Sequence, residues 1–183
     1  MKLRKFIATI IREYLNENNY LSNRVYRNIE TINTNNEDEL LDDAVNWGVD
    51  LIKNKLGITP NFEIKWGDTS NTFNKSINIR FKNPFHFKYR EEFYDTVLHE
   101  ICHVIDNTFG NISSRFGAEI NRSISDSVEW KKIPLNTAPT TYAKDSKDED
   151  FVISLQYALY GRLYELTDDR VEFLKQKFPK LKR

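Results

Sequence analysis

Residues 99–103 read His-Glu-Ile-Cys-His, so two histidines stand four positions apart. On an α-helix, residues four apart lie one turn above each other on the same side. His99 and His103 can then direct both imidazoles at one metal ion, and Glu100 can reach a water molecule on that metal. Two neutral imidazoles, an anionic third ligand and a water form an open tetrahedral zinc site. The motif therefore predicts one Zn²⁺ ion with Glu100 as a general base.

Three nearby residues are weighed as further participants. Cys102 lies three residues after His99 and shares its helix face only in part, so we interpret it as a small core residue. His86 precedes the helix in a loop, where a surface or packing role is expected. Asp106 lies two turns beyond His99 on the same face. It is either a partner for the outer N–H of a ligand histidine or an exposed acid near the helix end.

The motif needs a helix to hold it, and residues 89–106 have the required apolar periodicity. Before it, residues 62–66 and 77–81 alternate apolar and polar side chains, which is typical of strands with one buried face. Residues 67–74 are expected to connect these strands. A small sheet followed by a metal-binding helix is an architecture that zinc peptidases use, so the expected fold class is α+β.

Further helices are predicted on both sides of this region. Residues 37–56 have an apolar side, and Gly57 supplies a C-terminal cap. Residues 149–164 and 168–178 are expected to be helical, with Thr167 as a cap of the last helix. The stretch from 110 to 141 has no clear pattern, apart from a short helix expected at 125–130.

The N-terminal residues 1–36 are expected to form a helix followed by an asparagine-rich linker, before a single zincin-like domain at 37–183. Apolar residues between positions 3 and 15 follow helical spacing. We interpret this segment as a helix that docks on the body of the protein. A membrane-surface or partner-binding helix is the alternative.

Composition excludes several classes of protein. A length of 183 residues fits one domain with its own core. Lys plus Arg and Asp plus Glu number 27 each, which gives no electrostatic case for nucleic acid as the main partner. The single cysteine excludes an internal disulfide. No apolar run has the length of a membrane span or a signal-peptide core, so we expect a cytoplasmic protein or release without a classical signal peptide.

The third metal ligand is not part of the motif. In one class of zinc peptidase, a glycine follows three residues after the second histidine and a third ligand follows that glycine. Here those positions hold Asp106 and Phe109, so this class is excluded. The third ligand must come from elsewhere in the chain. The carboxylates downstream on plausible helices are Glu119, Glu129, Glu149 and Asp150.

At this point two segments together resemble a known family. Residues 99–106 and 142–151 resemble the catalytic domain shared by anthrax lethal factor and the Pro-Pro endopeptidases, which are zinc metallopeptidases of the gluzincin type. The resemblance covers about residues 89–160. It implies that Glu149 is the third ligand, with Tyr142 seven residues before it. The family often has a second acid four residues after the ligand, and here that position is Ile153.

The motif and the resemblance together predict a zinc-dependent endopeptidase. Glu100 would take the proton of the attacking water, and the hydroxyl of Tyr142 would donate to the developing oxyanion. An extended peptide or protein substrate is expected to pair with the edge of the strand at 75–81, where Asn78 faces outward. The alternatives are a zinc-containing binding or toxin-like module without general proteolytic activity, and a zinc hydrolase of non-peptide amides.

Overall fold

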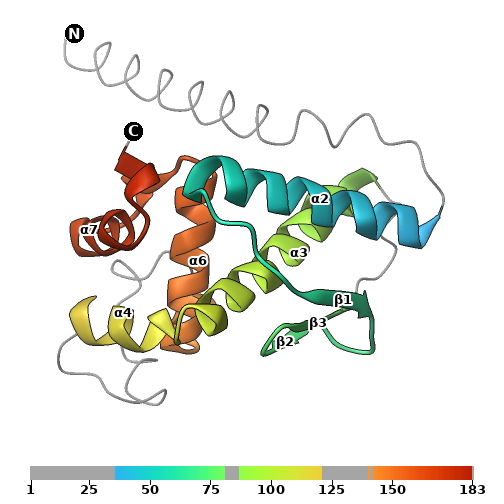
Figure 1. The fold of residues 1–183 in the computed structure, drawn as a ribbon, viewed down its shortest axis with the longest axis horizontal. Helices are drawn as coiled ribbons and strands as arrows, with labels where there is room; N and C mark the ends of the chain where they lie inside the picture. The colour runs from blue at the N-terminus through green and yellow to red at the C-terminus, as the bar shows by residue number, and fades with distance from the viewer. Residues whose placement is uncertain (1–35, 81–86, 121–139, 141, 183) are drawn as a thin grey trace, which may run out of the picture. The chain divides into compact units, whose positions relative to one another are not determined.

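The computed structural model describes residues 36–80, 87–120, 140 and 142–182. In this part the chain is α+β and mostly helical, with five α-helices and one three-stranded sheet (Figure 1). None of the helices in these ranges combines the length and the apolar character that a membrane span requires. The predicted N-terminal helix, His86, Glu129 and the short helix at 125–130 lie outside the described residues.

Helix α2 (Glu37–Leu56) has the predicted bounds, and the reason is local. Asn36 occupies the N-cap, where its side-chain oxygen accepts the N–H of Asp38 at 3.0 Å. Gly57 has a φ of 75° and donates its N–H to the carbonyl of Lys53. Because glycine adopts this left-handed conformation without a steric penalty, it ends the helix where the sequence indicates.

The sheet contains the two predicted strands, β1 (Glu63–Trp66) and β3 (Ser76–Ile79), and a third strand, β2 (Asn71–Phe73), that was expected to be a connection. The strand order is β1-β3-β2. Strand β1 runs parallel to β3, whereas β2 forms an antiparallel hairpin with it. The side chains of Ile77 and Ile79 are buried, as their alternation predicted.

This topology corrects the predicted substrate edge. Strand β3 lies in the middle of the sheet and pairs on both sides, with Asn78 opposite Lys65 of β1 and Asn71 of β2. It therefore cannot offer a free edge to a peptide. The prediction failed because a three-residue strand has too little alternation to be recognised, and its pairing decides which strand is at the edge.

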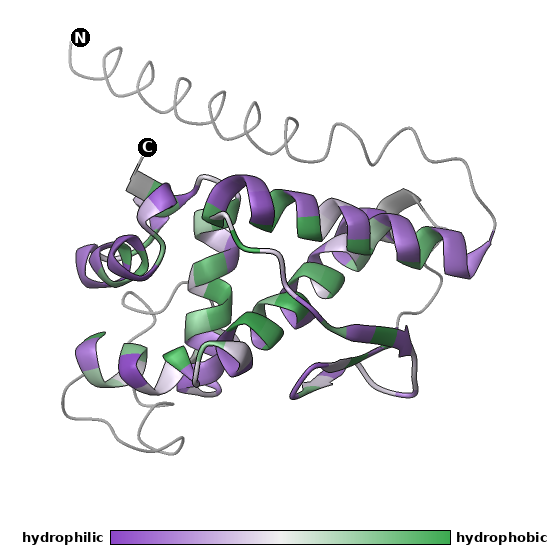
Figure 2. Cartoon of the chain, viewed as in Figure 1, coloured by the Kyte–Doolittle hydropathy of each residue, from purple (hydrophilic) through white to green (hydrophobic). Residues whose placement is uncertain are grey.

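Helix α3 (Phe87–Thr108) carries the histidine motif and extends slightly beyond the predicted residues 89–106 at both ends. It packs against α2, against the sheet and against α6. Hydrophobic colour accordingly concentrates on the inner sides of α3 and α6 (Figure 2). Cys102 is completely buried, which confirms its interpretation as a core residue, and burial raises the pKa of its thiol.

The C-terminal helices are α4 (Ile112–Ile120), α6 (Lys147–Leu159) and α7 (Asp168–Lys177). Helix α4 lies in the stretch that had no clear pattern. Helix α6 was predicted to run to residue 164, but it ends at Leu159 because Gly161 turns the chain with a φ of 77°. Short 3₁₀ turns follow at Leu163–Glu165 and Pro179–Lys182.

Helix α7 starts where the sequence predicts, although its cap works differently. Thr167 occupies the N-cap position, but its hydroxyl bonds the carboxylate of Asp169 instead of a backbone N–H of the helix. Asp169 in turn accepts the N–H of Arg170 at 3.0 Å. The predicted cap residue is therefore correctly placed, and an acid of the first turn completes its function.

Candidate metal centre

Three donor groups from two helices converge beside the sheet. The Nε2 atoms of His99 and His103, one turn apart on α3, are separated by 3.2 Å. Glu149 of α6 brings its two carboxylate oxygens to 3.1 Å from His99 Nε2 and 3.5 Å from His103 Nε2. The three ligand atoms lie within 4.8 Å of one another. This cluster could hold a metal ion.

The spacing of the donors fits a small tetrahedral ion. Zinc bonds to nitrogen and oxygen of about 2.0–2.1 Å place neighbouring ligand atoms about 3.3 Å apart in a tetrahedron. The two Nε2 atoms are 3.2 Å apart, and each has one oxygen of the Glu149 carboxylate near it, at 3.1 or 3.5 Å, while one donor atom from each residue lies within 4.8 Å of the others. In addition, Glu149 Oε2 is buried and faces the ring of His99, and it has no other polar partner among the described residues. A cation between the three groups would satisfy this oxygen.

Glu149 is positioned by the beginning of its helix. Ser146 is the N-cap of α6, and its hydroxyl accepts the N–H of Glu149 at 3.1 Å. A segment of 3₁₀-helix, η2 (Tyr142–Lys144), leads into this cap. The helix packs against both α3 and α4, and the completely buried side chains that follow Glu149 include Phe151, whose ring contacts Phe116 of α4. The depth of Glu149 in the site therefore depends on how α6 packs against α3.

The charges of the cluster keep its carboxylate ionised and make the imidazole of His99 more basic. Burial acts to raise the pKa of Glu149, but hydrogen bonds and charge from His103 and His99 outweigh it and lower this pKa to about 2. Burial acts to lower the pKa of His99, but the carboxylate of Glu149 outweighs it, so this pKa is raised. Glu149 is therefore ionised at neutral pH, as a metal ligand must be.

Glu100, the predicted general base, is positioned by the strand that the sequence did not reveal. It is only 6% exposed, and its Oε2 accepts a hydrogen bond of 2.6 Å from the hydroxyl of Thr72 in β2. The same hydroxyl lies 3.1 Å from the main-chain oxygen of Glu100. The carboxylate is thus held beside His99, next to an edge strand.

Tyr142 lies in η2 at the side of the cluster, with its ring centroid 5.8 Å from that of His99. The residue is 51% exposed. Partial burial raises the pKa of its hydroxyl, and the negative charges of Glu149 and Glu100 raise it further. The hydroxyl therefore keeps its proton at neutral pH and can donate a hydrogen bond.

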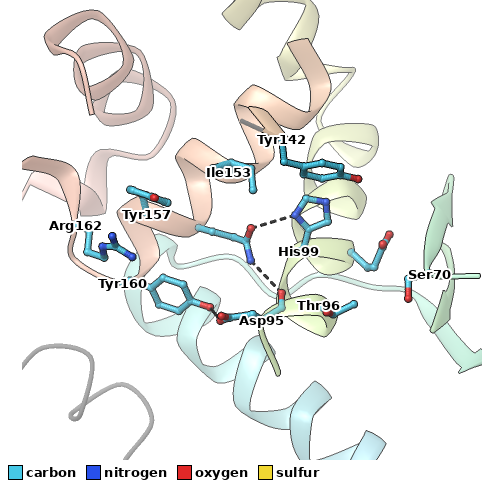
Figure 3. Close-up of a pocket in the computed structure, with 11 residues that line it drawn as sticks. Ser70, Asp95, Thr96, His99, Tyr142, Ile153, Tyr157, Tyr160 and Arg162 are labelled. Carbon is cyan, nitrogen blue, oxygen red and sulfur yellow. Dashed lines mark hydrogen bonds between the residues drawn. The ribbon is translucent and has the colours of Figure 1, made fainter. Parts of the chain in front are cut away.

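An open cleft of about 430 Å³ begins at His99 and Glu100 and is bordered by α3, α6 and the connection between β1 and β2. Figure 3 shows Tyr142 and Ile153 near the histidine, with Tyr157, Tyr160 and Arg162 at the opposite end. The guanidinium of Arg162 lies over the ring of Tyr157 at 4.3 Å. The cleft leaves His99 and Glu100 accessible from solvent.

Among the carboxylates considered as third ligands, Glu149 is the one that lies beside the histidines in the described part of the chain. Asp150 and Glu119 have other partners there. Asp150 points the other way along α6 and forms a buried ion pair with Arg170, at 3.0 and 2.5 Å. Glu119 is exposed on α4 and pairs with Arg115 at 3.2 Å.

The structure also corrects the interpretation of Asp106. It is buried, so it is not an exposed acid, and among the described residues no hydrogen bond joins it to either histidine. Its carboxylate instead accepts the N–H of Ser113 at 2.7 Å, at the start of α4. The residue that contacts the outer nitrogen of His99 is Gln156, which the sequence analysis missed. A possible signal was its position two turns after Glu149 on α6.

No family model, no curated protein and no solved structure matches the chain in comparisons with known proteins. A function is therefore inferred from the chemistry of the site itself.

Proposed function

We propose that this chain is a zinc-dependent endopeptidase with a zincin-like fold. The observation that carries the proposal is the convergence of His99, His103 and Glu149, whose donor atoms lie within 4.8 Å of one another, with the buried carboxylate of Glu100 beside them. A zinc ion held there would lower the pKa of its bound water and polarise the scissile carbonyl. The resemblance of residues 99–106 and 142–151 to the lethal factor and Pro-Pro endopeptidase family supports the same reading.

Glu100 is the general base in this mechanism. Its carboxylate is held by the hydroxyl of Thr72, which leaves it with one orientation beside His99. It takes the proton of the attacking water and later delivers it to the leaving amine. A structural zinc site has four protein ligands and needs no general base, so the buried carboxylate favours catalysis over the alternative of a zinc-containing binding module.

The substrate would lie along β2. This strand is at the edge of the described sheet, and Thr72 connects it to Glu100. Extended peptides add to such edges because main-chain hydrogen bonds hold any sequence in line. A peptide on β2 would therefore pass the base and the metal centre, which is the role that the sequence analysis assigned to residues 75–81.

Tyr142→Phe is expected to lower kcat by about a hundredfold, because removing one oxyanion donor has an effect of this size. The Michaelis constant and the zinc content should stay near those of the wild type, since the donor acts on charge that develops in the transition state. Steady-state kinetics on a cleaved peptide measures both terms. Tyr164→Phe, at an exposed tyrosine outside the residues that line the cleft, is the matched control. Unchanged kcat in Tyr142→Phe would remove this residue from the mechanism.

Cleavage of a mixed peptide library tests the proposed function. The zinc-loaded protein is incubated with the library, and new peptide termini are identified by mass spectrometry. We expect cleavage that disappears after chelation and returns with added zinc. Bound zinc without any cleavage would contradict the peptidase and favour a binding module. Hydrolysis restricted to small non-peptide amides would point instead to a hydrolase of that class.

A further inference from the structure

Gln156 connects the ligand histidine to the main chain of its own helix. Its side-chain oxygen lies 3.1 Å from His99 Nδ1, and its side-chain nitrogen donates to the carbonyl oxygen of Asp95 at 3.0 Å. Figure 3 draws these two contacts as dashed lines on either side of one amide. The side chain is only 7% exposed, so water does not readily replace either contact.

The contact with Asp95 decides which way the amide points. A main-chain carbonyl can only accept hydrogen bonds, so the amide group beside Asp95 must be the NH₂. The carbonyl oxygen of Gln156 then faces His99 and can only accept. For the contact of 3.1 Å to be a hydrogen bond, His99 Nδ1 must carry the proton.

This proton has a consequence on the other side of the ring. A neutral imidazole with its proton on Nδ1 has a free electron pair on Nε2, the atom that faces His103 and Glu149. In water, a neutral imidazole prefers the opposite tautomer, with the proton on Nε2. That tautomer would block the ligand atom, so the protein has to reverse the preference of the free side chain.

We propose that Gln156 is the positioning residue that holds His99 in the Nδ1–H tautomer and so prepares its Nε2 for the metal. The inference deepens the proposed function because it rests on the same metal centre, but it does not depend on peptidase activity. At position 153, where the resemblance predicts an acid, the apolar Ile153 cannot accept a hydrogen bond. Gln156 lies three residues further on the same face of α6 and supplies an uncharged acceptor instead.

Two hydrogen bonds join the C-terminal end of α6 to Asp95 of α3. Besides the amide of Gln156 on its main chain, Asp95 accepts a hydrogen bond on its side chain from the hydroxyl of Tyr160. Because Gln156 lies in the last turn of α6 and Tyr160 is its C-cap residue, both hold this end of α6 against Asp95 of α3. Tyr160→Phe removes the second anchor without touching the amide, and it is therefore the matched control.

Nitrogen NMR of histidine-labelled, metal-free protein tests the proposal directly in a Glu149→Ala background, because the carboxylate of Glu149 lies 3.1 Å from His99 Nε2 and would hold a proton there without the metal. The chain has 3 histidines, and His86→Asn and His103→Asn variants assign their signals. In this background, at a pH where all three imidazoles are neutral, we expect His99 to be protonated on Nδ1 with the native Gln156, with Gln156→Glu and with Tyr160→Phe. Gln156→Met, which has a similar shape but no acceptor, should revert to protonation on Nε2.

Zinc affinity, measured by competition with a chelator, supplies a second readout. Losing a hydrogen-bond partner of a ligand histidine lowers metal affinity by about 10–100-fold, so we expect a loss of this size in Gln156→Met. Gln156→Glu should retain most of the affinity, because its carboxylate still accepts from Nδ1 although the bond to Asp95 is lost. A merely structural role of Gln156 would make both variants fail alike.

The outcomes separate this inference from the proposed function. In the Glu149→Ala background, protonation of His99 on Nε2 with the native Gln156, or retention of the Nδ1–H tautomer with Gln156→Met, would overturn the role of Gln156. If a variant does not fold without metal, spectra of the zinc-loaded protein show which nitrogen is coordinated, and coordination through Nδ1 would overturn it as well. The expected tautomers together with an inactive zinc protein would leave the inference intact and reject the peptidase.

Discussion

Replacing Glu100 by Gln is expected to leave zinc binding intact and to lower the rate of peptide cleavage by about a hundredfold or more. The amide keeps the shape of the side chain, and its oxygen can still accept the hydrogen bond from the Thr72 hydroxyl. It cannot take a proton from the attacking water. The loss should therefore appear in activity and not in the fold or the zinc content.

The measurement combines zinc analysis of the purified variant with kinetics on a peptide identified in the library. Glu91→Gln is the matched control, because Glu91 is an exposed residue of the same helix. It should retain wild-type rates. A zinc-loaded Glu100→Gln protein with full activity would disprove the proposed mechanism.

Replacing Glu149 by Ala is expected to abolish tight zinc binding. The substitution removes the anionic ligand and leaves only the two imidazoles, whose Nε2 atoms are 3.2 Å apart. Loss of a directly bound ligand should lower affinity by more than the roughly 10–100-fold seen for second-sphere partners. Glu119→Ala and Glu129→Ala should bind zinc as the wild type does, and Glu119 already has an exposed partner in Arg115.

Metal analysis and thermal unfolding together measure this effect. Zinc that binds the folded protein alone raises its melting temperature, so the wild type and both controls should melt higher with zinc than without. Glu149→Ala should lose this increase while melting as a folded protein in chelator. Retention of tight zinc by Glu149→Ala would require a different third ligand. Asp150 would then have to leave its buried ion pair with Arg170.

Local features of the chain were sufficient to predict two of the helices well. The bounds of α2 follow from Asn36 and Gly57, because caps act on backbone groups only a few residues away. The apolar spacing of α3 likewise predicted which of its residues would be buried. Helix α6 was predicted too long because Gly161 was not recognised as its end, although the left-handed turn there is also a local feature.

The strand order of the sheet could not be predicted from local sequence. A three-residue strand such as β2 is defined by its hydrogen bonds to β3 and not by its own composition. The edge of a sheet is a property of strand order, so it could not be derived from the alternation of Ile77 and Ile79. The wrong substrate edge follows directly from the missed strand.

At the candidate metal centre, too, some features follow from local sequence and others only from tertiary packing. The sequence by itself determined that His99 and His103 share one side of a helix, since a spacing of four residues is local helix geometry. The resemblance singled out Glu149 among the candidate carboxylates, but only the tertiary structure brings it to the histidines, because the packing of α6 turns Glu149 toward them and Asp150 toward Arg170. It also decided the supporting contacts. Thr72 reaches Glu100 from 28 residues away, and Gln156 reaches His99 from 57 residues away, so neither pairing exists before the elements pack.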